Sequence, residues 1–160
     1  MSSVILCVGK MKEKPYRQMA DEYLKRLSRY GKYEEAEIAD LPEPASGTSE
    51  ALEEQLKTKE GEALLAKIRP GDRVIALTIG GKRRSSEELA RHLEELKTGG
   101  TSHLVFVIGG SLGLGKNVLA RADEELSMSP MTFPHQLARV MLLEQLYRAE
   151  KINAGERYHK

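Results

Sequence analysis

Two glycine-rich segments have the residue types that could bind a ligand through the backbone. They are residues 77–81 (LTIGG) and residues 108–115 (IGGSLGLG). Each one follows an apolar run typical of a buried strand, and glycine at a strand end lets a ligand approach the backbone closely. Tight turns alone would need the same glycines. Because two such segments follow consecutive predicted strands, we favour a ligand-binding cleft.

The second segment is close to a phosphate-binding loop. Residues 110–117 (GSLGLGKN) differ from G-x-x-x-x-G-K-[ST] at Asn117, which stands where a hydroxyl would bind magnesium. No later apolar strand ends in an Asp that could hold the metal's water. A nucleotide triphosphatase is therefore an alternative, not the favoured function. A dinucleotide site is less supported still, because the G-x-G-x-x-G spacing is missing.

The carboxy-terminal quarter holds charged and aromatic groups that could contact a nucleotide. His135 and Arg139 are four residues apart on one predicted helix, and Glu144 and Arg148 repeat that spacing. The second pair is interpreted as a surface ion pair, whereas His135 fits a structural and a functional role equally well. The chain ends in groups that can stack on a base or pair with phosphate: Arg157, Tyr158, His159 and Lys160.

Neither metal nor disulfide chemistry is indicated. The histidines have no metal-ligand spacing among them: His92, His103, His135 and His159. Cys7 is the only cysteine and lies in an apolar run, so we interpret it as a core residue of a protein in the reducing cytoplasm. That run, residues 4–8, is too short for a signal peptide or a membrane span.

Charge is nearly balanced in total but separated along the chain. The 160 residues predict one domain, and 25 Lys and Arg against 24 Asp and Glu give a net charge of +1, which argues against general binding to nucleic acid. Residues 9–32 carry eight basic and three acidic groups, whereas residues 33–62 carry two basic and ten acidic groups. Solvated surfaces are the favoured interpretation of both runs.

Patterns typical of strands and helices alternate along the chain. Apolar or extended runs predict strands at residues 4–8, 33–39, 74–77, 104–108 and 126–128, the third ending at Gly80 and Gly81. Helical spacing and capping residues predict helices at residues 16–27, 49–68, 85–97, 116–121 and 134–150. The alternation predicts an α/β domain with a mainly parallel sheet and helices on both faces.

The last predicted helix is apolar around much of its girth, over residues 140–143. A helix of this kind must be covered on several sides, by its own sheet and by a second copy of the chain. We therefore expect a homodimer.

Several ordered blocks of sequence resemble one known family. They are residues 77–90 (LTIGGKRRSSEELA), residues 106–113 (FVIGGSLG), and residues 131–160 from MTFPHQLAR through EQLYRA to YHK. Together with VGKMKE at residues 8–13, they resemble the RlmH family of the SPOUT superfamily, which methylates N3 of a pseudouridine in large-subunit ribosomal RNA. The resemblance covers the whole chain.

The resemblance implies one SPOUT domain over residues 1–160, with a carboxy-terminal trefoil knot. It implies a homodimer that acts without a metal on the helix 69 loop of 23S ribosomal RNA, in the large subunit or 70S ribosome, with no membrane. S-adenosylmethionine is the implied methyl donor. The residues implied to bind it are Leu77, Gly109, Gly110, Met128, Ser129, Pro130, Met131, Thr132 and Phe133.

The implied reaction needs a base that removes the proton from N3. His159 and His135 are the bases that we would test. The groups expected to hold the nucleotide are Arg139, Arg148 and Tyr158. Thr78 stands where many relatives have Asp, so we leave it outside the catalytic set. A noncatalytic ribosome-binding protein is the remaining alternative.

Overall fold

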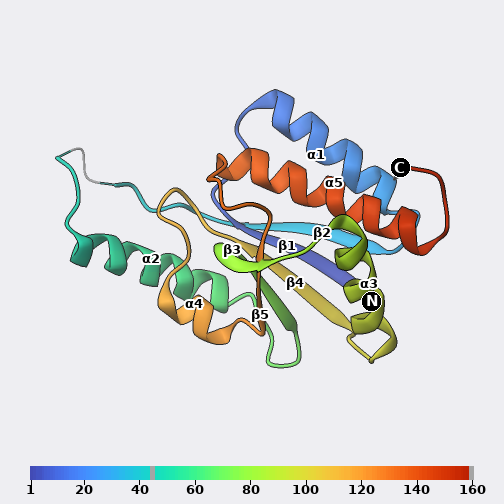
Figure 1. Ribbon diagram of the computed structural model, residues 1–160. Helices are drawn as coiled ribbons and strands as arrows, with labels where there is room; N and C mark the ends of the chain where they lie inside the picture. The colour runs from blue at the N-terminus through green and yellow to red at the C-terminus, as the bar shows by residue number, and fades with distance from the viewer. Residues whose placement is uncertain (44–45, 159–160) are drawn as a thin grey trace.

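The chain forms an open, twisted sheet with helices on either side (Figure 1). The structure is a computed structural model that describes residues 1–43 and 46–158. Within these residues, five parallel strands lie in the order β2-β1-β4-β3-β5. The strands are β1 (Ser2–Val8), β2 (Lys32–Ile38), β3 (Arg73–Arg83), β4 (His103–Ile108) and β5 (Glu124–Ser127). The predicted α/β class with a parallel sheet is confirmed.

The helices cover both faces of the sheet, as predicted. They are α1 (Lys14–Leu27), α2 (Glu50–Leu65), α3 (Ser86–Thr98), α4 (Lys116–Arg121) and α5 (His135–Asn153). α1 and α3 each pack against α5 on one face, and α2 packs against α4 on the other. Crossing a bilayer would take a longer and more apolar helix than any found in the described ranges. The trefoil knot that the resemblance implies stays a prediction.

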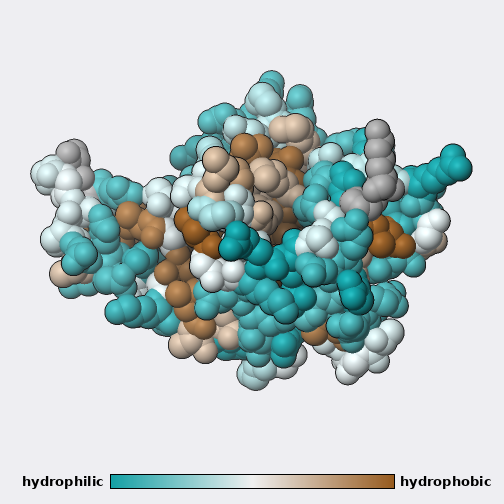
Figure 2. Space-filling model, in the orientation of Figure 1, coloured by the Kyte–Doolittle hydropathy of each residue, from teal (hydrophilic) through white to brown (hydrophobic). Residues whose placement is uncertain are grey.

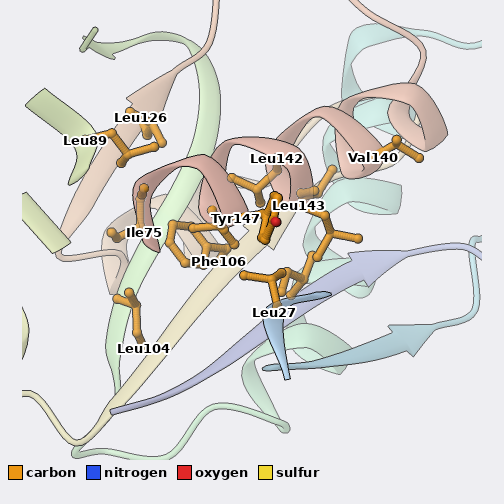
Figure 3. Close-up of a cluster of buried hydrophobic side chains, with 14 of the residues drawn as sticks. Leu27, Ile75, Leu89, Leu104, Phe106, Leu126, Val140, Leu142, Leu143 and Tyr147 are labelled. Carbon is orange, nitrogen blue, oxygen red and sulfur yellow. The ribbon is translucent and has the colours of Figure 1, made fainter. Parts of the chain in front are cut away.

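The larger core lies between α5 and the sheet. Leu142 and Leu143 of α5 are fully buried, and Figure 3 shows them beside Tyr147, close to Phe106 of β4 and Leu27 of α1. Because α1 and α3 flank α5, the chain itself covers much of the apolar girth of this helix. The girth therefore does not by itself require a second copy, and the homodimer stays a prediction.

Cys7 is a core residue, as predicted. Its side chain lies in β1 and is 1% exposed. Burial raises the pKa of the Cys7 thiol to about 12. Because the thiolate is the reactive form, this cysteine is chemically inert in the folded protein.

β3 is longer than predicted, because Gly80 and Gly81 do not end it. The strand continues to Arg83 and pairs with β5 on both sides of a register shift. A Cβ on Gly81 would lie only 2.7 Å from the carbonyl carbon of Glu125, so glycine is what allows the two strands to approach. Gly80 and Gly81 therefore lie at an irregularity in the pairing of β3 with β5, and β3 does not end there.

The predicted capping serines begin two of the helices, Ser49 at α2 and Ser85 at α3. The hydroxyl of Ser85 accepts a hydrogen bond from the Glu88 N–H at 3.1 Å, and the Glu88 carboxylate accepts one from the Ser85 N–H at 2.7 Å. This capping box fixes the first turn of α3. α4 has the predicted bounds, and α5 extends three residues beyond the predicted end.

Replacing Gly81 by alanine is expected to lower the free energy of unfolding by about 1–3 kcal/mol, as at other overpacked sites. The added methyl group would meet the backbone of Glu125 in β5. Gly80→Ala is the matched control, because a Cβ at that position would have nothing within 4 Å. Urea unfolding of both variants measures the difference, and equal stabilities would contradict the role assigned to Gly81.

Candidate cofactor pocket and nucleotide-binding groups

A pocket of about 720 Å³ opens at the carboxyl edge of the sheet. Its walls are residues 77–79 of β3, residues 108–113 at the end of β4 and beyond, and a segment that follows β5. This edge is where open parallel sheets bind ligands, and the volume is in the range of small-molecule sites. The two segments therefore meet at one cavity, the first through residues 77–79 and the second through residues 108–113, whereas Gly80 and Gly81 do not line it.

The pocket brings together eight of the nine residues that the resemblance implies for the methyl donor. Pro130 is exposed and is not among the lining residues. Those that line the pocket are Leu77, Gly109, Gly110, Met128, Ser129, Met131, Thr132 and Phe133. They come from three segments that are distant in the sequence, so the fold and not local spacing gathers them.

The loop after β4 has no room for side chains at its first two glycines. A Cβ on Gly109 would lie 2.7 Å from the carbonyl carbon of Gly113, and one on Gly110 would lie 3.2 Å from Cγ1 of Val8. The loop turns back on itself through a bridge between Gly110 and Gly113, where Gly113 has a φ of +84°. This wall therefore offers backbone groups to a ligand.

The segment after β5 supplies an apolar wall. Hydrogen bonds of 3.0 Å join the Ser127 hydroxyl to the Ser129 carbonyl and the Met131 N–H to the Ser129 hydroxyl, and they hold its turn. Met131 is 71% exposed at the rim, and Ile79 on the β3 side is 54% exposed. Figure 2 shows hydrophobic side chains gathered near the middle of one face, with hydrophilic side chains around them. The rim thus offers apolar surface to a bound molecule.

His135 lies at the mouth of this pocket. It is the first residue of α5, is half-buried, and also lines a neighbouring cavity of about 250 Å³. Asp40, Glu43 and Glu60 line that smaller cavity, and burial raises the pKa of Glu60. His135, one of the two predicted bases, therefore lines both cavities. His159, the other predicted base, lies outside the described residues.

Arg139 lies in the core, so the predicted contact with a nucleotide is corrected. Its side chain is 1% exposed. One guanidinium nitrogen donates to Glu37 at 2.6 Å, and another donates to the carbonyl of Gly9 at 3.0 Å. Glu35, which also pairs with Arg17, lies 3.7 Å from the same guanidinium. With these partners the guanidinium is not available to a nucleotide.

Glu144 is the centre of a polar cluster, although its spacing to Arg148 predicts only a surface pair. Its carboxylate accepts hydrogen bonds from Arg148, from the Tyr158 hydroxyl at 3.1 Å and from the Gln145 amide at 2.8 Å. The side chains of Glu144 and Arg148 are 19% and 24% exposed. The Arg148 guanidinium also lies 4.7 Å from the centroid of the Tyr158 ring. Helical spacing does not indicate this cluster, because Tyr158 lies beyond the end of the helix.

This cluster borders a second cavity, of about 540 Å³, between α1, α3 and α5. Glu144 lines the cavity together with Met19 and Tyr23 of α1. Leu126 and Met128 line both this cavity and the first pocket, so the two spaces adjoin. Arg148 and Tyr158 remain as candidates for binding the nucleotide. Both contact Glu144, and Glu144 lines the cavity that adjoins the predicted donor pocket.

Asn117 has a structural use that does not suit a phosphate-binding loop. Its amide donates to the carbonyl of Thr58 in α2 at 3.1 Å, and its Oδ1 accepts from the Val118 N–H at 3.0 Å. The side chain thus fixes α4 to α2, and its Oδ1 packs against Gly115. Across residues 1–43 and 46–158, no group of three or more His, Cys, Asp or Glu side chains could hold a metal ion.

Comparison with known proteins gives a consistent result. A family model described as Predicted SPOUT methyltransferase matches residues 1–159. Relatives from Exiguobacterium sp. and Clostridium novyi are each 54% identical over 160 residues, and one from Bifidobacterium animalis subsp. lactis is 55% identical over 162 residues. All three alignments span the whole of both chains, and each relative is named Ribosomal RNA large subunit methyltransferase H.

Replacing Arg139 by methionine is expected to lower the free energy of unfolding by about 3–5 kcal/mol, as when one partner of a buried ion pair is removed. Glu35 and Glu37 would lose the buried one of their two shared cations and keep only Arg17, which is partly exposed. Lys32→Met is the control, because Lys32 pairs with Glu34 on the surface, where such a pair contributes about 0–1 kcal/mol. Denaturant unfolding measures both losses, and a loss for Arg139→Met as small as the control's would refute the buried role.

Proposed function

The chain belongs to the SPOUT methyltransferases, in the family of ribosomal RNA large subunit methyltransferase H, and on this basis we propose the reaction that it catalyses. A methyl group passes from S-adenosylmethionine to N3 of a pseudouridine in the helix 69 loop of 23S ribosomal RNA. The proposed substrate is the assembled ribosome, the working unit is a homodimer, and the compartment is the cytoplasm. The pocket of about 720 Å³, where eight of the nine implied donor-binding residues meet, carries the proposal.

The residues of the pocket fit this methyl donor. Leu77, Met128 and Phe133 give an apolar wall that suits the adenosyl group. At Gly109 and Gly110, where side chains have no room, the backbone can reach the polar edges of adenine or the carboxylate. When bound there, S-adenosylmethionine supplies a methyl group on a positively charged sulfur.

The target nucleotide is proposed to enter the adjoining cavity of about 540 Å³, on the other side of Met128. Arg148 and Tyr158 would hold it, the first by pairing with phosphate or a base edge and the second by stacking. Both side chains are oriented by Glu144. Fixing the acceptor beside the donor accounts for most of the rate enhancement, because a random encounter is replaced by a defined geometry.

N3 of the pseudouridine must lose its proton for the methyl group to bond there. His135 at the mouth of the pocket is one proposed base, and His159, assigned from the sequence alone, is the other. Imidazole suits this role because its ordinary pKa lies near neutrality. Burial raises the pKa of Tyr158 to about 12, so its hydroxyl stays protonated and acts as a hydrogen-bond donor.

Titration of S-adenosylmethionine into the protein is expected to give saturable heat. Gly109→Ala is expected to weaken this binding about tenfold, because overpacking costs on the order of 1–3 kcal/mol and tenfold is about 1.4 kcal/mol. Gly71→Ala is the control, since a Cβ there meets nothing within 4 Å. Saturable heat with ATP and magnesium but none with S-adenosylmethionine would instead support the triphosphatase.

Transfer of a labelled methyl group to ribosomes that lack the modification tests the reaction and its base. Loss of the general base is expected to lower kcat by about 10²–10⁴-fold, so His159→Ala or His135→Gln should show this loss while S-adenosylmethionine still binds. A wild-type rate across pH for both variants would exclude histidine as the base. Binding of ribosomes by the wild-type protein without any transfer would support the noncatalytic alternative.

A further inference from the structure

Three exposed lysines follow β1, two of them on the segment that joins β1 to α1 and the third at the first residue of α1. Lys10, Lys12 and Lys14 alternate with the buried Met11 and the exposed Glu13. We propose that these lysines form a phosphate-binding surface that holds the ribosomal RNA backbone next to the donor pocket. The inference rests on the proposed function, which it extends from the target nucleotide to the strand that carries it.

The segment is held firmly by its buried residues. The Gly9 N–H donates to the Ile38 carbonyl at 2.8 Å, and the Gly9 carbonyl accepts from Arg139 at 3.0 Å. Met11 is 7% exposed and belongs to the larger core. Because the backbone is fixed at these two positions, the lysines extend from a preorganised base, and less entropy is lost when they bind.

The segment lies at the edge of the sheet where the donor pocket opens. Val8, the last residue of β1, is next to Gly110 in the pocket wall, where a Cβ would lie 3.2 Å from Cγ1 of Val8. Arg139 joins Gly9 to the first turn of α5, and His135 at the start of that turn lines the pocket. Figure 1 shows the connection from β1 to α1 close to the start of α5. The lysine segment therefore begins beside the pocket wall.

The lysine charges are not neutralised by ion pairs. In the described part of the chain, other lysines form ion pairs with carboxylates, namely Lys32, Lys57, Lys97 and Lys151. No such pair within the described residues involves the three lysines of this segment, and three lysines less Glu13 leave a local charge of +2. A phosphodiester chain is the partner that such charges favour, because each contact releases counterions into solution.

An acidic group of side chains lies beside the same segment, since a Cβ on Gly9 would be 3.9 Å from Asp40. Asp40, Glu43 and Glu60 line the smaller cavity that shares His135 with the donor pocket. These carboxylates repel phosphate, whereas the lysines attract it. The backbone of an RNA strand is therefore directed along the exposed lysines and away from the carboxylates of the smaller cavity.

A triple variant tests this surface: Lys10→Gln, Lys12→Gln and Lys14→Gln. The control removes the same charge at the opposite edge of the sheet, with Lys25→Gln, Lys67→Gln and Lys97→Gln, all exposed. Ribosome Kd is measured over a range of salt concentrations. Because each phosphate contact contributes about 0.7–0.9 to the slope of log K against log salt, the test triple should lower that slope by about 2–3, and the control should not.

Two further readouts separate this inference from the proposed function. The test triple is expected to raise KM for ribosomes while kcat and the affinity for S-adenosylmethionine stay at wild-type values. A wild-type slope and Kd for the test triple, or an equal change in both triples, would overturn the lysine surface. The wild-type protein could transfer no methyl group while the salt slope of the test triple still differs from that of the control triple. In that case the proposed function fails and the lysine surface stands.

Discussion

The buried guanidinium of Arg139 is the contact on which the geometry of the site depends. It joins the start of α5 to Glu37 of β2 and to the carbonyl of Gly9 after β1. A charge at 1% exposure must have such partners, because an unpaired charge in the core would be strongly destabilising. One side chain thus sets where the chain leaves β1 and where α5 begins. Since His135 begins α5, one side of the pocket mouth is fixed by a contact outside the pocket.

The other walls of the pocket are set by close approaches of backbone to backbone. At Gly81 and at Gly109 a Cβ would lie 2.7 Å from another residue's carbonyl carbon, in β5 and at Gly113 respectively. The first contact brings β5, and with it the segment from Met128 onward, against β3. The second folds the loop after β4 into a wall without side chains. The binding surface is therefore a product of how the strands and loops pack, and a change in packing changes the site.

These dependences explain which features the sequence could predict. Strands, helices and the capping box at Ser85 follow local patterns, and the donor-binding segments follow from a resemblance that spans the chain. The end of β3 was wrong because a glycine pair is typical of a strand end, and the pairing of Gly81 with β5 depends on residues more distant in the chain. The burial of Arg139 and the further partners of Glu144 escape prediction for the same reason, although the pair of Glu144 with Arg148 is confirmed. Helical spacing shows neighbours on one helix, whereas their partners include Glu37 and Tyr158.

The net charge of +1 has a structural meaning that its value conceals. Basic residues follow β1 and acidic residues follow β2, and the fold places both groups around one entrance, with Lys10 near Gly9 and Asp40 in the smaller cavity. Opposite charges that lie beside one another at an entrance attract a polyanion weakly overall but orient it strongly. Weak overall attraction limits binding to unrelated RNA. Orientation serves the proposed reaction directly, because methyl transfer to one ring nitrogen depends on how precisely the acceptor is positioned.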